Sequence, residues 1–296
     1  MRKAIILGML GGLLFSVAAH ADMKLATWNM EHLAENNGMG CRAREEADYA
    51  KLKAIAEKLN ADVVAIEEVE STAAAYRVFD PAKYTVEMTK QPKAKGYRCS
   101  SGNPQSPKST PQHVGFAIKK GIAYSRNADF KALDVTGANG LRWGVDITLN
   151  GSNPLRLLAV HLKASCPGGK SDSARHDCVT FFRQQPVLEG EWIEKRYSEG
   201  IAFAVLGDFN RHVLEPDDAF WSLTNDETSP GLKLTPVKAL DERRCKTYPK
   251  RIDHIIVDAR AKRRVRMNTT SVLEYGVPKK QYPSDHCPLS VILTDG

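Results

Sequence analysis

The chain has 296 residues, of which 42% are hydrophobic and 26% are charged, and its formal net charge is +7. This composition is typical of a folded globular protein and excludes a disordered, collagen-like or coiled-coil chain. The small excess of cations favours polyanionic partners without selecting one.

Residues 1–21 have the features of a secretory signal peptide. Arg2 and Lys3 precede an apolar run over residues 4–19, and Ala19-His20-Ala21 forms a small-x-small cleavage site. A membrane anchor is the alternative, but the run is shorter than the roughly 20 residues that a spanning helix needs. We therefore expect a secreted or periplasmic protein with a single domain over residues 22–296. Loss of the two leader cations lowers its net charge from +7 to +5.

Six cysteines follow the leader, and an even number in an exported protein indicates disulfide bonds. A zinc site is the alternative, but no C-x-x-C pair occurs and the cysteines lie far apart. Cys166 and Cys178 flank one loop rich in glycine and serine, so we predict a bridge between them. For the other four cysteines we prefer the pairs Cys41–Cys99 and Cys245–Cys287.

Apolar segments with strand composition dominate the rest of the chain. The predicted strands cover residues 24–28, 62–66, 113–119, 141–149, 155–162, 201–206, 252–257 and 289–293. The predicted helices cover residues 44–59, where five apolar side chains share one face, and residues 181–198. Several strands are continuous apolar runs, which indicates sheets covered on both faces. We therefore predict a layered α/β fold in which one sheet packs on another.

Residues 89–112 are rich in lysine, proline, serine and glycine and show neither the helical nor the strand period. We interpret them as a long surface loop, because neither flank has enough strands to close a core alone; a linker between two domains is the alternative. Its cations could follow a nucleic-acid backbone while Tyr97 stacks on a base, or it could be a solvated connector. These cations are Lys90, Lys93, Lys95, Arg98 and Lys108.

Polar residues fall where the predicted strands end. They are Asn29, Glu67 and Glu68, His161, Asp208 and Asn210, Asp253, and the pair Asp285-His286 before the last strand. If these ends converge, the site contains carboxylates, amides and two imidazoles without a thiolate. Such hard ligands suit Mg²⁺, Mn²⁺ or Ca²⁺ better than zinc.

The same residues carry a family resemblance. The motifs W-N, E-E-V, V-H-L, G-D-F-N, R-I-D-H and S-D-H-C-P-L occur in this order along essentially the whole mature chain. In order and spacing they resemble the endonuclease/exonuclease/phosphatase superfamily, whose members have the deoxyribonuclease I-like fold. The resemblance implies a four-layer sandwich of two packed mixed sheets flanked by helices. It also implies a divalent metal and the hydrolysis of phosphate esters.

The resemblance assigns roles to individual residues. Glu68 corresponds to the principal metal-binding glutamate, with Asn29 beside it, and Asp285 matches a further metal-binding position. Glu67 points to the opposite side of an extended chain and is not expected to be a ligand. Asp208 and Asn210 correspond to the pair that orients the attacking water and holds the phosphate or a second metal.

Two histidines and an arginine complete the implied site. His286 resembles the catalytic histidine that activates water or stabilises the phosphorane, and Asp253 fixes its tautomer. His161 resembles the second histidine, a phosphate ligand or general acid. Arg142, in G-L-R-W, lies where secreted nucleases carry a phosphate-binding arginine. His254, next to Asp253, is expected to face away into the structure.

The leader, the cysteines and the stretch G-L-R-W-G-V-D resemble bacterial secreted or periplasmic nucleases. We therefore expect a monomeric endonuclease that uses Mg²⁺, with Mn²⁺ or Ca²⁺ as alternatives, to hydrolyse DNA or RNA. A sphingomyelinase-like or other phosphoesterase on lipid or small phosphate esters is the alternative. However, the sequence shows no aromatic hairpin for entering lipid, and no stable membrane association is expected. A non-catalytic exported binding protein would lack a metal carboxylate or a histidine, and none is missing.

Overall fold

The computed structural model describes residues 22–93, 96–100, 102–168, 176–216, 218–224, 232–239, 245 and 250–294. The predicted signal peptide, residues 1–21, lies outside the described residues, and so does Lys95 of the basic loop. No helix in the described part of the chain is long and apolar enough to cross a membrane.

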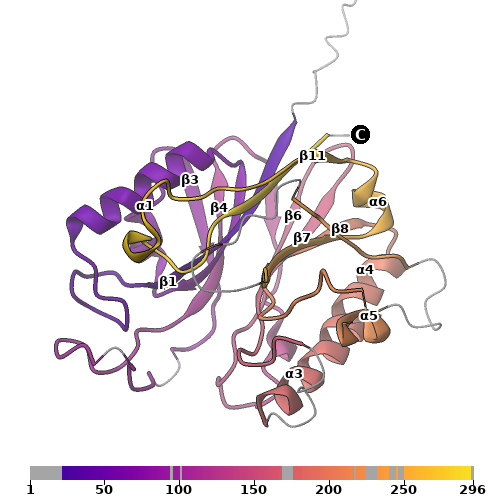
Figure 1. The fold of residues 1–296 in the computed structure, drawn as a ribbon. Helices are drawn as coiled ribbons and strands as arrows, with labels where there is room; N and C mark the ends of the chain where they lie inside the picture. The colour runs from indigo at the N-terminus through magenta and orange to yellow at the C-terminus, as the bar shows by residue number, and fades with distance from the viewer. Residues whose placement is uncertain are drawn as a thin grey trace, which may run out of the picture.

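Two mixed six-stranded sheets pack face to face (Figure 1), which confirms the predicted α/β class. The first sheet has the order β11-β12-β1-β2-β4-β3 and the second has the order β5-β6-β7-β8-β10-β9. The first consists of β1 (Met23–Leu33), β2 (Val63–Val69), β3 (Tyr84–Met88), β4 (His113–Lys119), β11 (Val265–Val272) and β12 (Leu289–Leu293). The second consists of β5 (Tyr124–Arg126), β6 (Val145–Leu149), β7 (Leu155–His161), β8 (Ala202–Asp208), β9 (Thr235–Pro236) and β10 (Asp253–Val257). Parallel pairing joins β1 to β2 and β7 to β8.

The core between the sheets is built from alternate residues of both. Leu25, Val63 and Phe116 of the first sheet pack in one buried cluster with Leu157 and Leu206 of the second. The residues between them face outward and are covered by helices, so these strands carry apolar side chains on both faces. This double covering explains the continuous apolar runs in the sequence.

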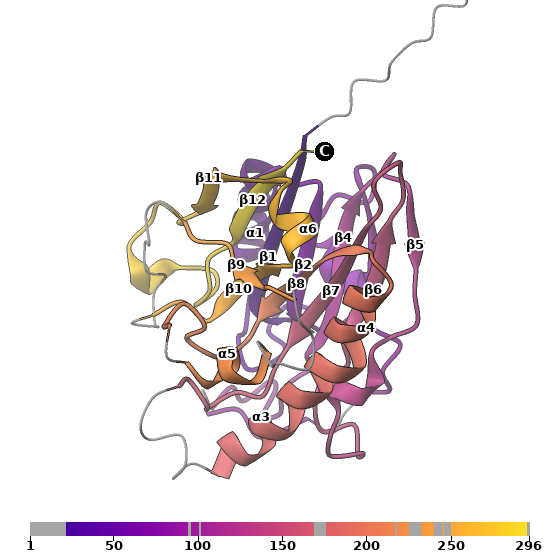
Figure 2. The same cartoon turned by 90° about the vertical axis from the view of Figure 1, so that its right-hand side faces the viewer.

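Helices cover the two outer faces. On the first sheet lie α1 (Glu46–Leu59) and α2 (Thr72–Tyr76). On the second, α3 (His176–Val187), a π-helical turn (Leu188–Ile193) and α4 (Glu194–Ser198) follow one another along the sheet (Figure 2). Short helices α5 (Ala219–Thr224) and α6 (Ala259–Lys262) and the 3₁₀ turns η1 (Lys131–Leu133) and η4 (Lys279–Gln281) complete the described elements.

Two predicted elements differ from the structure. The helix predicted from residue 181 begins at His176 and is interrupted by the π-helical turn. Pro186 lies just before this turn and has no N–H to donate, which disfavours regular α-helical bonding there. The strand predicted from residue 141 begins only at Val145, because residues 141–144 leave the sheet and carry Arg142 toward its neighbours.

All three predicted disulfides, Cys41–Cys99, Cys166–Cys178 and Cys245–Cys287, are present. The first anchors the loop over residues 89–112 to the connection between β1 and α1. Asn103 of this loop also donates to the backbone oxygens of Gly38 and Gly40, each at 2.9 Å. The loop joins β3 and β4, which are neighbours in one sheet.

Candidate active site

The predicted strand ends converge where the two sheets meet. Asn29, at the end of the regular β1–β2 pairing, donates its side-chain amide to carboxylates of both sheets. Its Nδ2 lies 3.3 Å from Oε1 of Glu68 on β2 and 3.0 Å from Oδ2 of Asp208 on β8. Its Oδ1 accepts from the backbone N–H of Glu31 at 2.9 Å. In this arrangement Asn29 holds the two carboxylates through its nitrogen, and its oxygen accepts one backbone hydrogen bond and keeps a second lone pair.

The backbone around these residues adopts conformations that non-glycine residues rarely take. Glu68 has a φ of +59° and Asn210 a φ of +53°, while Glu31 and His32 have φ values of +45° and +56°. Left-handed conformations in bulky residues cost free energy and occur where the surrounding structure holds them, often at functional sites. At Glu68 the left-handed backbone lies in an irregularity of the β2–β4 pairing and ends the simple alternation of side chains along β2.

Gly207, in the G-D-F-N motif, brings β8 close to β7. Its φ is +149°, and a Cβ built there would lie 1.9 Å from the backbone oxygen of Val160. Only glycine permits this approach, and the resulting register sets Asp208 opposite His161. Gly207 therefore allows the close strand pairing that positions Asp208.

His286 and Asp253 form a buried pair. Nδ1 of His286 lies 2.9 and 2.8 Å from the two carboxylate oxygens of Asp253. Its Nε2 faces Oδ2 of Asp208 and Oδ1 of Asp285, each at 3.8 Å. Burial opposes protonation of this imidazole, but the surrounding carboxylates, Asp253 first, raise the pKa of His286 well above its ordinary value. The imidazole is therefore the cationic group of the cluster.

Asp208 lies at the centre of the cluster and is almost fully buried. Burial raises the pKa of its carboxyl to about 7, although the positive charge of His286 opposes this. Its Oδ1 accepts from the backbone N–H of Asn210 at 2.8 Å. The Asn210 side chain donates to the backbone oxygen of Leu162 at 3.2 Å, which fixes the amide beside Asp208.

His161 and Arg142 contact each other beside Asp208. Nε2 of His161 accepts a hydrogen bond from Nη2 of Arg142 and lies 3.5 Å from Oδ2 of Asp208. Burial and the Arg142 charge hold the pKa of His161 well below its ordinary value, so this imidazole is neutral. The two histidines of the site thus carry opposite protonation states.

Sequence reasoning did not single out His32. Its backbone N–H donates to Oε2 of Glu68 at 3.0 Å, and its Nε2 lies 3.7 Å from the same oxygen. Burial opposes the charged form of Glu68, but His32, Arg142 and His286 together lower the pKa of this carboxyl. Tyr97 of the disulfide-anchored loop hydrogen-bonds Nε2 of His32 at 3.0 Å. No local pattern signals this contact, since the two residues are 65 positions apart.

Glu67 points away from Glu68 and is fully buried. Thr27 donates its hydroxyl to Oε1 of Glu67 at 2.9 Å. Burial and the charge of Asp253 raise the pKa of the Glu67 carboxyl well above its ordinary value, which favours a neutral acid. His254 is also buried, and its Nε2 donates to the backbone oxygen of Arg211 at 2.9 Å.

The model of the Endonuclease/Exonuclease/phosphatase family matches residues 26–286, most of the chain. The chain belongs to this family. Among curated proteins none matches the sequence significantly.

Solved structures share the fold of the family across nearly the whole chain. The catalytic domain of human Nocturnin with bound sulfate is 17% identical, with 92% of this chain and 93% of that chain covered and a TM-score of 0.60. TDP2 from D. rerio complexed with a single-strand DNA product is 15% identical, with 92% and 98% covered and a TM-score of 0.58. A family protein from Bacteroides thetaiotaomicron is 14% identical, with 93% and 95% covered and a TM-score of 0.56.

The family is generally dependent on a divalent metal, and the donor set of the cluster suits one. Glu68 and Asp208 present carboxylate oxygens on either side of the Asn29 amide. The ligand atoms of Asp208, Asp253 and His286 also lie within 4.8 Å of one another. All six cysteines are in disulfides, so oxygen donors dominate the candidate ligands. Such donors suit Mg²⁺, Mn²⁺ or Ca²⁺.

Proposed function

We propose that this chain is a secreted, monomeric, divalent-metal-dependent phosphodiesterase that cleaves DNA internally, with RNA as a second polymer containing the same ester. Residues 22–296 would form one catalytic domain after removal of residues 1–21. The observation that carries the proposal is the convergence of Glu68, Asp208 and the His286–Asp253 pair on one point between the sheets.

A divalent ion held by Glu68 and Asp208, with Asp285 at its edge, would withdraw charge from the nonbridging oxygens of the phosphodiester. We assign Asp208 and Asn210 to positioning the attacking water, with the Asp208 carboxylate held beside the Asn210 backbone by a hydrogen bond of 2.8 Å. The oxygen of water forms the new bond to phosphorus, and the bond to the leaving oxygen breaks.

We assign His286 to stabilising the negative charge that develops on the phosphate and on the leaving oxygen. The neighbouring carboxylates raise the pKa of His286, which favours its charged form, and Asp253 holds its Nδ1–H, so its Nε2–H is the group directed at the substrate. His161 is neutral and already accepts from Arg142, so we assign it to orienting Arg142, the phosphate ligand, rather than to supplying a proton.

A cavity beside Arg142 supports a nucleic-acid substrate. It has a volume of about 590 Å³ and lies between the anchored loop and residues 138–142, with Tyr97, Lys93 and Asn139 among its lining residues. Tyr97 is 52% exposed and offers a ring on which a base can stack. The TDP2 structure from D. rerio, a relative in fold, was obtained with a single-strand DNA product.

The lipid alternative has less support. Large hydrophobic side chains exposed in the described part of the chain are Met39, Tyr97, Val179 and Val277. They belong to four separate segments and include one aromatic ring, so they do not form a hairpin that could enter a bilayer.

The experiment is to incubate mature protein with Mg²⁺, Mn²⁺ or Ca²⁺ and, in parallel, plasmid DNA, linear DNA, single-stranded DNA, RNA and sphingomyelin. We expect plasmid nicking that His286→Ala reduces at least about 10²-fold. His176→Ala, which removes an exposed histidine away from the cluster, is the control and should cleave normally. Cleavage of sphingomyelin without cleavage of either nucleic acid would refute the nuclease proposal.

A further inference from the structure

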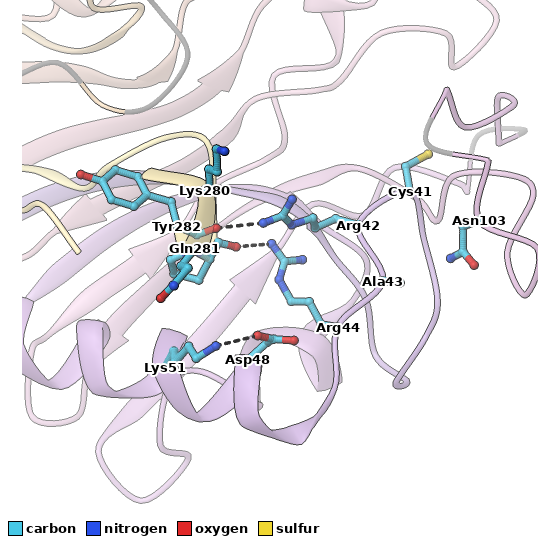
Figure 3. Close-up of a pocket in the computed structure, with 11 residues that line it drawn as sticks. Cys41, Arg42, Ala43, Arg44, Asp48, Lys51, Asn103, Lys280, Gln281 and Tyr282 are labelled. Atoms are coloured by element: carbon cyan, nitrogen blue, oxygen red, sulfur yellow. Dashed lines mark hydrogen bonds and ion pairs between the residues drawn. The ribbon is translucent and has the colours of Figure 1, made fainter. Parts of the chain in front are cut away.

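A second cavity lies beside α1 (Figure 3). It has a volume of about 520 Å³, and its walls come from residues 41–44, the first turns of α1, Asn103 and residues 280–283. Four cations line it, namely Arg42, Arg44, Lys51 and Lys280, against one carboxylate, Asp48. The lining therefore carries an excess of three positive charges.

The four cations differ in their contacts. Arg44 is 2% exposed and donates to the backbone oxygens of Met30 at 2.8 Å and Pro283 at 2.7 Å, so it belongs to the frame of the cavity. Lys51 is exposed and pairs with Asp48 at 3.1 Å, which a surface position makes weak. Lys280 is exposed and has no acceptor in the described part of the chain. Lys51 and Lys280 are thus the two ammonium groups open to a ligand.

Arg42 connects this cavity to the candidate site. Its Nη2 donates to the backbone oxygen of Tyr282 at 2.8 Å, and its Nε lies 3.6 Å from Oε2 of Glu31. The same Glu31 carboxylate accepts the backbone N–H of Asp285 at 2.9 Å. Residues 280–283 also lead directly into Ser284, Asp285 and His286. The wall of the cavity is therefore joined to the segment that carries Asp285 and His286, both along the chain and through the contacts of Arg42 and Glu31.

The residues that line the cavity favour the phosphate backbone of a nucleic acid over its bases. Among the described residues that line the cavity, Tyr282 is the one aromatic; it is 4% exposed, and its ring packs on Tyr275 at 4.9 Å between centroids. It offers no face for stacking. Ammonium and guanidinium groups without an aromatic platform bind phosphates irrespective of sequence.

We propose that this cavity binds phosphodiester groups of the substrate strand beyond the one that is cleaved. The inference rests on the proposed function and narrows it, since it makes a polynucleotide rather than a small phosphate ester the natural substrate. The positive charge of the cavity acts on substrate affinity and places the strand across Asp208 and His286.

The test compares two double variants with the same change of charge. Lys51→Gln/Lys280→Gln neutralises the two open cations of the cavity. Lys53→Gln/Lys279→Gln, the control, neutralises exposed lysines of the same helix and the same turn that do not line it. Binding of fluorescein-labelled dodecathymidylate to each protein is measured by anisotropy in EDTA, from 0.05 to 0.3 M salt, so that no cleavage occurs.

Counterion release from single strands gives a slope of about −0.7 per phosphate contact, or about fivefold in affinity per contact at 0.1 M salt. The cavity variant should therefore bind about 25-fold more weakly at that salt, with a salt slope lower by about 1.4, while the control changes by less than about twofold. Equal losses in the two variants would overturn the proposal, because they would reflect net charge alone.

Two further measurements distinguish a nucleic-acid phosphate from free phosphate and from a lipid headgroup as the ligand of the cavity. Inorganic phosphate at millimolar concentration should displace the oligonucleotide only weakly, and phosphatidylserine vesicles should not bind through Lys51 and Lys280. Vesicle binding that is lost in the cavity variant, with oligonucleotide binding unchanged, would assign the cavity to a membrane and refute our reading. Wild-type protein that binds the oligonucleotide through these lysines yet cleaves no nucleic acid would retain the subsite and remove the proposed function.

Discussion

Asp253→Asn tests whether the charge behind His286 drives catalysis. The two short contacts between them are buried and charge-assisted, and bonds of this kind contribute about 1.5–3 kcal/mol. Since 1.36 kcal/mol corresponds to a factor of ten in rate, we expect kcat to fall about 10- to 150-fold. The change also removes the carboxylate that most raises the pKa of His286, so the alkaline limb of the rate profile should move to lower pH.

The assay is cleavage of plasmid DNA and of bis-p-nitrophenyl phosphate between pH 5 and 9, with Asp253→Asn made alone and together with His286→Ala. If Asp253 acts only by orienting and charging His286, the second change should cost little in a protein that already lacks the imidazole. Independent, multiplicative losses would refute this reasoning and assign Asp253 a direct role, such as metal binding. A reduced rate with an unshifted pH profile would contradict only the predicted effect of Asp253 on the pKa of His286.

Four further predictions concern the metal, the fold and its pH dependence. EDTA should abolish cleavage and Mg²⁺ or Mn²⁺ should restore it; full activity after exhaustive chelation would remove the metal mechanism. Replacing both Cys166 and Cys178 with Ser should lower the free energy of unfolding by about 3 kcal/mol, and an unchanged urea midpoint would contradict this. Gly207→Ala should destabilise the fold by about 3 kcal/mol or more in the same assay. Gly200→Ala, also at positive φ but in open space, should cost clearly less, and equal losses would disprove a steric cause. Burial lowers the pKa of His254 to about 3 in the folded protein, whereas an unfolded chain has the ordinary histidine pKa of about 6.5. As pH falls below about 6.5 the unfolded chain takes up a proton that the folded protein does not, so the free energy of unfolding decreases. Between pH 6.5 and 5 the wild type should lose about 2 kcal/mol more than His254→Gln, and parallel losses in urea titrations would argue against it.

The strands at the centre of each sheet could be predicted because their sequences report burial directly. β4 and β12 occupy the predicted residues: in β4 an uninterrupted run over residues 114–118 lies between His113 and Lys119, and in β12 four of the five residues are apolar. Edge strands carry less signal. β11 alternates exposed and half-buried residues and contains Arg266 and Asn268, so its pairing with β12 is set by the neighbouring strand and not by its own composition.

The polar set of the site was predictable from motifs, whereas its geometry was not. The left-handed backbone at Glu68 depends on a bulge whose position is fixed by pairing with two other strands. The protonation states of His161 and His286 likewise depend on which charges the fold brings beside them. His161 ends β7 and His286 precedes β12, and neither position distinguishes the two imidazoles; their pKa values differ because of the groups that contact them in three dimensions.

Glu68 and Asp208 belong to different sheets, and the Asn29 amide spans the gap between them. The separation of the two carboxylates is therefore set by the thickness of the apolar layer between the sheets, where Phe116 and Leu206 lie. A smaller side chain in that layer would let the sheets settle and change the spacing on which metal affinity depends, without touching any polar residue. Under the proposed function, softening of this layer would lower the activity at temperatures at which the chain is still folded, and adaptation to heat or cold could proceed through residues far from the chemistry.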